Sequence, residues 1–128
     1  MKQTTNVILM VRPVGFRMNE QTAVNNYYQQ ELVDTLPATI NAKAQREFDD
    51  LVIKLQNNGV VVIVVDDTET PSTPDSLFPN NWISFHQNGD VALYPMFAEN
   101  RRLERREDIL DKLEEKGFLI ENIVDYTA

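Results

Sequence analysis

Two segments share one pattern, an amphipathic helix followed by a glycine and a short strand, and this pattern constrains the fold more than any other feature. In residues 41–58, apolar side chains recur every three or four positions, the spacing of one buried helix face. Gly59 follows, where a glycine commonly ends a helix. Residues 60–65, VVVIVV, are an uninterrupted β-branched run, which predicts a central strand covered on both faces. This order favours an α/β architecture.

The second segment repeats this order nearer the C-terminus. Residues 101–116 carry a helical stripe of leucine and isoleucine, Gly117 ends it, and FLIENIVDY at 118–126 alternates as a strand does. The two glycines lie 117 − 59 = 58 positions apart. We interpret the match as an internal repeat of one supersecondary unit, although two unrelated helices ending in glycine would share part of it. The same offset pairs Asp50 with Asp108, Leu51 with Ile109, Lys54 with Lys112 and Leu55 with Leu113.

The remaining elements complete a mixed sheet. Residues 6–11, NVILMV, predict a buried strand, and a short helix is expected near residues 22–30. Residues 66–81 are rich in Asp, Thr, Ser and Pro, which predicts a long surface loop of the kind that is often functional. Strands at 82–86 and 91–94 flank an Asn-Gly pair, which is a hairpin signal. We therefore predict an α/β (α+β) fold, a mixed sheet with helices packed on it.

Length and composition bound the class of protein. The 128 residues suffice for one compact domain, so we predict a single domain over 1–128. A net charge of −8 would repel phosphate backbones, which argues against a nucleic-acid partner, and it serves either solubility or a cationic small molecule. No apolar run approaches the ~20 residues that span a bilayer, and the start is too short for a secretory signal. We expect no membrane contact and a cytoplasmic location.

Few residues are suited to metal, cofactor or nucleophilic chemistry. The sequence has no cysteine, so it contains neither a disulfide nor a thiol nucleophile. His86 is the one histidine, which makes a histidine-rich zinc site impossible, and we interpret it as structural. The four glycines are scattered and form no phosphate-binding loop. We therefore predict no metal and no cofactor.

Three blocks carry a resemblance to known enzymes. They are RPVGFRMNEQTAVNNYYQ at 12–29, TPDSLFPNNWISFHQNGDVALYPM at 73–96 and AENRRLERRED at 98–108. Together they resemble the amidinotransferase-like, or pentein, superfamily of guanidino-group-modifying enzymes, especially its citrulline-utilization hydrolase branch. Arginine deiminase and dimethylarginine dimethylaminohydrolase are better-known relatives. The resemblance implies a propeller of ββαβ units around a central site, with about two of its five units in this chain.

The resemblance also implies what the chain would do. Such enzymes act on C–N bonds of arginine-type or citrulline-type amino acids through a cysteine and a histidine in later units, so this chain would be an N-terminal portion without catalytic residues. Its partner would be a small guanidino or ureido amino acid. The alternative is a truncated, non-catalytic domain that binds ligands or assembles with itself as a homo-oligomer through open sheet edges.

Four residues are candidate substrate contacts by the same resemblance. Asp75 matches an aspartate that binds guanidino nitrogens, and the alternative is that it caps a turn. Asn81, with Asn80 before it, replaces a second acid and could donate to a ureido oxygen, or could bond only to local backbone. Arg101 lies near an arginine that grips a substrate carboxylate, or belongs to a solvated, salt-bridged helix face.

Overall fold

The structure is a computed structural model that describes residues 4–23 and 37–128. Within it the chain forms two compact units, unit 1 over Met1–Phe78 and unit 2 over Pro79–Ala128. Each unit combines strands with helices, so the predicted α+β class is confirmed. The assignment of a single domain over 1–128 stays a prediction.

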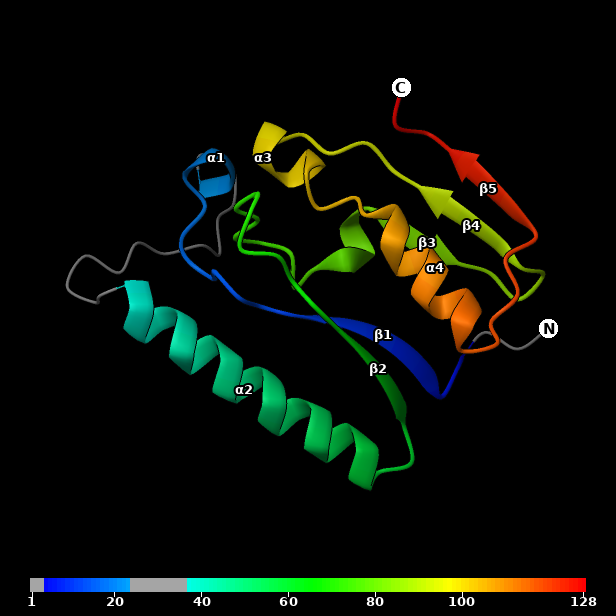
Figure 1. Ribbon diagram of the computed structural model, residues 1–128, viewed down its shortest axis with the longest axis horizontal. Helices are drawn as coiled ribbons and strands as arrows, with labels where there is room; N and C mark the ends of the chain where they lie inside the picture. The colour runs from blue at the N-terminus through cyan, green and yellow to red at the C-terminus, as the bar shows by residue number, and fades with distance from the viewer. Residues whose placement is uncertain (1–3, 24–36) are drawn as a thin grey trace. The chain divides into compact units, whose positions relative to one another are not determined.

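Unit 1 is a β-α-β arrangement (Figure 1). Strand β1 (Val7–Arg12) pairs in parallel with β2 (Val61–Asp66), and helix α2 (Pro37–Asn57) connects and lies beside them. Pro37 suits the first turn of α2 because proline lacks the amide hydrogen that would have no helical partner there. The short helix α1 (Glu20–Ala23) confirms only the start of the helix expected near residues 22–30, whose remainder lies outside the described residues.

Strand β2 is less covered than its apolar sequence predicts. Ile63 and Val65 are buried, whereas Val61 and Val64 keep exposed fractions of 52% and 40%. The prediction of a strand covered on both faces is therefore wrong. The physical reason is that α2 is the one long helix in the described part of unit 1, and a single helix can cover only one face of the sheet.

A row of polar side chains on α2 fixes the segment that leaves β1. Asn41 donates to the carbonyl of Val14 and accepts from the amide of Phe16, and Gln45 donates to the carbonyl of Pro13. One turn further on, the carboxylate of Asp49 accepts two bonds from the guanidinium of Arg12, at 2.9 and 3.0 Å. Positions 41, 45 and 49 share one helix face, so a single polar row follows the chain over residues 12–16.

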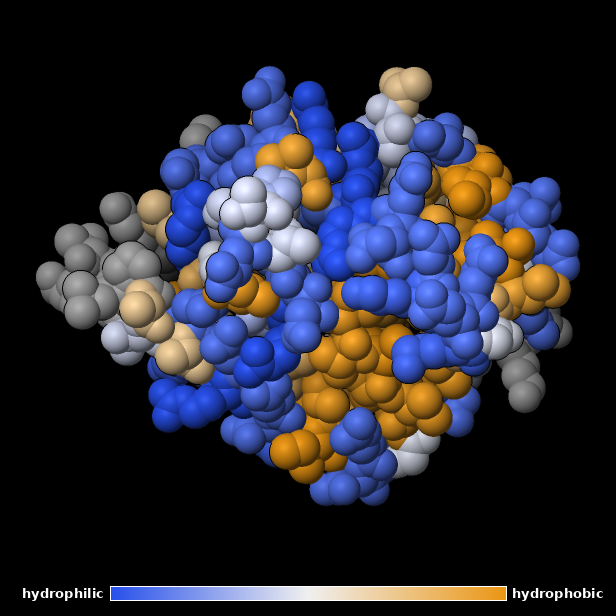
Figure 2. All heavy atoms as spheres, in the orientation of Figure 1, coloured by the Kyte–Doolittle hydropathy of each residue, from blue (hydrophilic) through white to orange (hydrophobic). Residues whose placement is uncertain are grey.

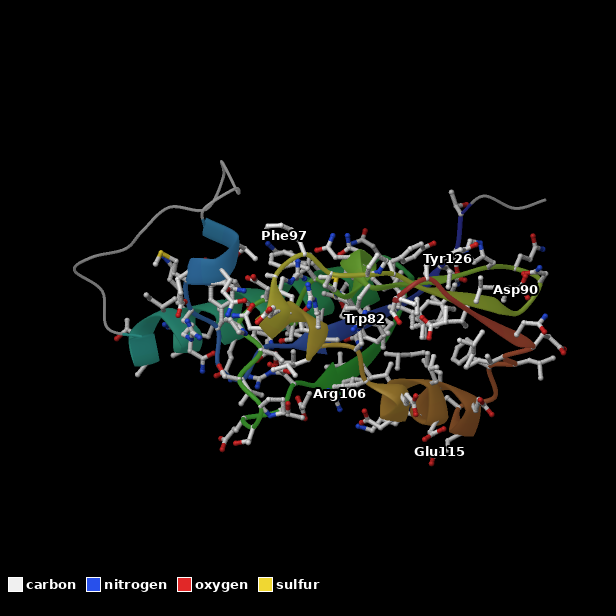
Figure 3. All side chains as sticks on the ribbon, turned by 90° about the horizontal axis from the view of Figure 1, so that it is seen from above. Trp82, Asp90, Phe97, Arg106, Glu115 and Tyr126 are labelled. Carbon is white, nitrogen blue, oxygen red and sulfur yellow. The ribbon has the colours of Figure 1, made fainter. Side chains whose placement is uncertain are left out.

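Unit 2 contains a complete ββαβ arrangement, whereas the described part of unit 1 has one strand before its long helix. Strands β3 (Ile83–Phe85) and β4 (Asp90–Leu93) form the predicted hairpin, with Gly89 at a φ of +90° in the turn. Helices α3 (Glu99–Arg102) and α4 (Glu107–Glu115) follow, and β5 (Asn122–Asp125) then pairs in parallel with β4. Trp82 is 2% exposed, and Tyr126 stacks on Tyr94. Figure 3 labels Trp82 and Tyr126.

The two helix ends match bond for bond. The amide of Val60 donates to the carbonyl of Leu55, and that of Phe118 donates to the carbonyl of Leu113. Gly59 and Gly117 take φ angles of +83° and +94° and donate to Gln56 and Glu114. Both are Schellman ends, and every donor and acceptor is related by the offset of 58 positions. The repeat is therefore confirmed at the helix ends. A parallel strand follows each end, but β5 begins at residue 122, whereas the offset of 58 from Val61 gives residue 119.

Three other predicted elements differ from the structure. The single helix at 101–116 is wrong, because the chain leaves helical geometry between α3 and α4, where Arg106 is extended. Strand β5 is shorter than the predicted 118–126. The 66–81 segment is not a surface loop throughout, because Thr73 to Ser76 are buried and a 3-10 turn, η1 (Pro79–Asn81), follows.

Among residues 4–23 and 37–128, no helix has the length and hydrophobicity to cross a membrane.

Candidate functional site

Asp75 lies in unit 1 as a buried carboxylate with an exposed fraction of 7%. Its Oδ2 accepts a hydrogen bond from the side-chain amide of Asn19 at 2.8 Å and lies 3.3 Å from the hydroxyl of Thr22. These partners are 56 and 53 positions away, so the carboxylate joins distant segments rather than only a local turn. A carboxylate can in addition accept charge-assisted hydrogen bonds from the paired N–H groups of a guanidinium.

Asn19 owes its orientation to the start of α1. Its side-chain oxygen accepts the backbone amide of Gln21, which is the bond of a helix cap, so its amide nitrogen turns toward Asp75. The whole residue is 0% exposed. The sequence contained one local signal for this role, an asparagine directly before Glu20, but nothing that connected it with a residue 56 positions away.

The loop around Asp75 is held by its own polar contacts. The hydroxyl of Thr73 is within 2.7 and 2.9 Å of both carboxylate oxygens of Asp67, and both residues are buried. Successive turns then bond Ser76 to Thr73 and Phe78 to Asp75 through the backbone. The Oγ of Ser76 is buried and has no hydrogen-bond partner within the described residues. A buried hydroxyl of this kind can bond to an ordered water or a ligand.

The second group of predicted residues lies in unit 2 and centres on Arg101. Its Nε and Nη2 donate to the two carboxylate oxygens of Glu104 at 2.9 and 3.0 Å, and its Nη1 donates to Asn81 Oδ1 at 3.0 Å. The side chains of Arg101 and Glu104 are 12% and 1% exposed. The interpretation of a solvated, salt-bridged face is therefore wrong for this pair. Glu104 was missed because its charge and spacing are those of a surface residue.

The structure thus brings together two of the four predicted contacts, Asn81 and Arg101. Asn80 is exposed in the same 3-10 turn, η1, as Asn81. Asp75 belongs to unit 1, with Asn19 and Thr22 as its neighbours. The roles of these four residues in binding a substrate stay predictions.

The single histidine lies on the exposed hairpin. The Nε2 of His86 is 3.0 Å from the hydroxyl of Ser84, which is also 2.8 Å from the hydroxyl of Tyr94. Sequence analysis did not identify Ser84 as a neighbour, although alternate residues of one strand share a face. Within the described ranges, no three His, Cys, Asp or Glu residues gather as metal ligands.

Comparison with known proteins places these units in a superfamily. The family model described as N,N dimethylarginine dimethylhydrolase, eukaryotic, matches residues 12–128, nearly the whole chain. The chain is thus of the guanidino-group-modifying, pentein type, as the resemblance predicted. More narrowly, it belongs to the eukaryotic N,N dimethylarginine dimethylhydrolase family. The citrulline-utilization branch stays a prediction. Neither the search of curated proteins nor that of solved structures found a match.

Proposed function

We propose that this chain binds the headgroup of a guanidino or ureido amino acid, as the substrate-orienting part of a C–N hydrolase. The observation that carries the proposal is the family match over residues 12–128, which includes Asp75. A methylated arginine is the first substrate to test, because the matched family is described by dimethylarginine. Arginine and citrulline are the other two ligands to test, because the arginine headgroup is cationic and the citrulline headgroup is neutral.

Asp75 is the proposed contact for guanidino N–H groups. A carboxylate accepts charge-assisted hydrogen bonds from paired N–H donors, and these are among the strongest in proteins. Its Oδ2 is oriented by Asn19 and Thr22, so little ordering cost remains when a ligand binds. Asn81 and Asn80 are proposed as contacts for the ureido group. Arg101 lies in the same unit, and its proposed role is to bond to Asn81 or to bind the ligand's carboxylate.

Bond cleavage in this class of enzyme requires a nucleophile, which this sequence does not contain as a thiol. We therefore propose that the 128 residues bind and orient a ligand without hydrolysing it.

The substitution Asp75→Asn tests the proposal directly. An amide keeps the shape of the side chain but loses its charge, so binding of arginine or dimethylarginine should weaken about tenfold or more, and citrulline much less. Asp50→Asn, an exposed site on α2, is the matched control and should change neither affinity. Titrations followed by backbone amide shifts should give a wild-type Kd of about millimolar.

The same titrations decide between outcomes. Shift changes should begin at residues 75–82 and should be much smaller for Asp75→Asn at the same arginine concentration. If arginine binds equally well to the wild type and to Asp75→Asn, or shifts only residues 101–106, Asp75 is not the guanidino contact. Release of ammonia, methylamine or urea by the purified wild-type chain would contradict the proposal that it does not hydrolyse its ligand.

A second candidate function, a self-assembling domain, is favoured by the exposed apolar residues on both sheets. Val61 and Val64 on β2, and Ile123 and Val124 on β5, are at least 37% exposed. Strands with exposed apolar side chains at a sheet edge readily pair with another chain. This candidate is compatible with ligand binding, so it is tested separately by the oligomeric state.

A further inference from the structure

The guanidinium of Arg101 determines which end of the Asn81 amide faces outward. A guanidinium has donors and no acceptor, so only the oxygen of the amide can face it. That contact is the 3.0 Å bond from Arg101 Nη1 to Asn81 Oδ1. The oxygen and the nitrogen of an amide diverge from the same carbon, so with Oδ1 bonded to Arg101 the Nδ2 of Asn81 points in another direction. Asn81 itself is exposed, so this NH2 group is accessible.

The guanidinium is also fixed in place. Its other edge forms two parallel bonds with Glu104, whose side chain is 1% exposed, and the arginine side chain is 12% exposed. A planar fork held at two atoms keeps little freedom to rotate, and separating a buried ion pair would leave a charge without compensation. The donor that holds Asn81 is therefore rigid.

We propose that Arg101 is a positioning residue, which orients Asn81 so that its Nδ2 is the end presented to a ligand. The proposal rests on the proposed function, because it takes Asn81 as a ligand contact. Such a group donates, so at this contact it suits the oxygen of a ureido headgroup. A guanidinium, which only donates, would meet a second donor there. The position thus favours neutral over cationic headgroups through orientation rather than charge.

The ligand-free protein tests the orientation itself. In a labelled sample of the full chain, one side-chain rotamer of the Asn81 amide should dominate. In the double variant Arg101→Met/Glu104→Gln, which removes both charges together, the amide should sample both orientations. Arg102→Gln is the matched control, because Arg102 donates to the carbonyls of Met96 and Phe97 instead.

A second variant covers the case in which the double variant does not fold. Arg101→Lys keeps the positive charge for Glu104, but an ammonium cannot form the fork that reaches two partners in fixed directions. The Asn81 amide should again lose its single orientation. A wild-type amide without a dominant rotamer, or an amide that stays in one rotamer in both variants, overturns the proposal.

Ligand selectivity gives the second readout. The ratio of the citrulline Kd to the arginine Kd should rise about tenfold in favour of arginine when Arg101 no longer orients Asn81, whereas a merely structural role would weaken both ligands equally. An unchanged ratio in a folded variant overturns the role in selectivity. If no ligand binds the wild type while the orientation result holds, the proposed function fails and the orienting role of Arg101 survives.

Discussion

At the scale of single residues, two of the hydrogen-bonded pairs join positions that lie far apart in the sequence. Asn19 bonds to Asp75, and Asp49 bonds to Arg12, across 56 and 37 positions. The first bond joins the residue before α1 to the loop that carries Asp75, and the second joins the end of β1 to α2. The orientation of Asp75 therefore depends on a hydrogen bond from a distant segment.

The Arg12–Asp49 pair predicts a pH dependence. The hydrogen bond from Arg12 holds the pKa of Asp49 below its ordinary value of 3.8. A lowered folded-state pKa contributes stability above pH 3.8, and that contribution is lost as the pH falls through the folded-state value. Asp49→Asn should thus lower the free energy of unfolding at neutral pH, and the difference from wild type should shrink below pH 3.8.

Urea unfolding at several values between about pH 7 and pH 3 measures this difference. Asp50→Asn is the control, since that neighbouring carboxylate is exposed. A difference between Asp49→Asn and wild type that stays constant over the whole range would mean that the ion pair contributes nothing to folding.

At the scale of elements, the sequence predicted the helices, helix ends and turns that depend on interactions between nearby residues. The helical stripe predicted α2, the glycine stop predicted the end of α4, and the Asn-Gly pair predicted the hairpin turn. Each of these features depends on residues a few positions apart. The break between α3 and α4 was missed, because Glu104 points into a buried bond with Arg101 instead of continuing a solvated face. Among the candidate contacts, Asp75 came from resemblance, and its partners could not be inferred without the fold.

Because the two helix ends match, we expect the same substitution at each end to lower the free energy of unfolding by the same amount. Gly59→Ala and Gly117→Ala should each lower the free energy of unfolding by about 1 to 2 kcal/mol, because an L side chain is strained at positive φ. A Cβ at either site meets no atom within 4 Å, so the backbone conformation is the whole cost. Gly15→Ala is the control, with the same open space and no positive φ, and should not destabilise.

Chemical denaturation of the three variants provides the measurement. Equal losses at positions 59 and 117, with none at 15, are expected. A large difference between the first two would show that the repeat is confined to hydrogen-bond geometry and does not extend to energetics.

At the scale of the whole molecule, apolar side chains are exposed on strands of both units. Figure 2 shows apolar residues gathered over β1 and β2 on the visible face, and Val61 and Val64 are among the exposed residues of unit 1. In unit 2, Ile123 and Val124 of β5 are 54% and 37% exposed. In the described part of the chain, β2 and β5 each pair with one neighbour, which leaves one edge of each strand open.

These open strands predict self-association, and β5 offers the sharpest test. Burying an isoleucine side chain contributes roughly 1.5 to 3 kcal/mol, and a new strand on the open edge would satisfy backbone groups as well. Sedimentation at micromolar concentration should therefore show a dimer or larger species for the wild type. Ile123→Lys places a charge on the edge strand and should shift the population to monomer. Ile53→Lys changes an equally exposed isoleucine, 54% in both cases, but on helix α2, and should leave the association unchanged. A wild-type chain that sediments as a stable monomer and binds no hydrophobic dye would exclude assembly through these edges.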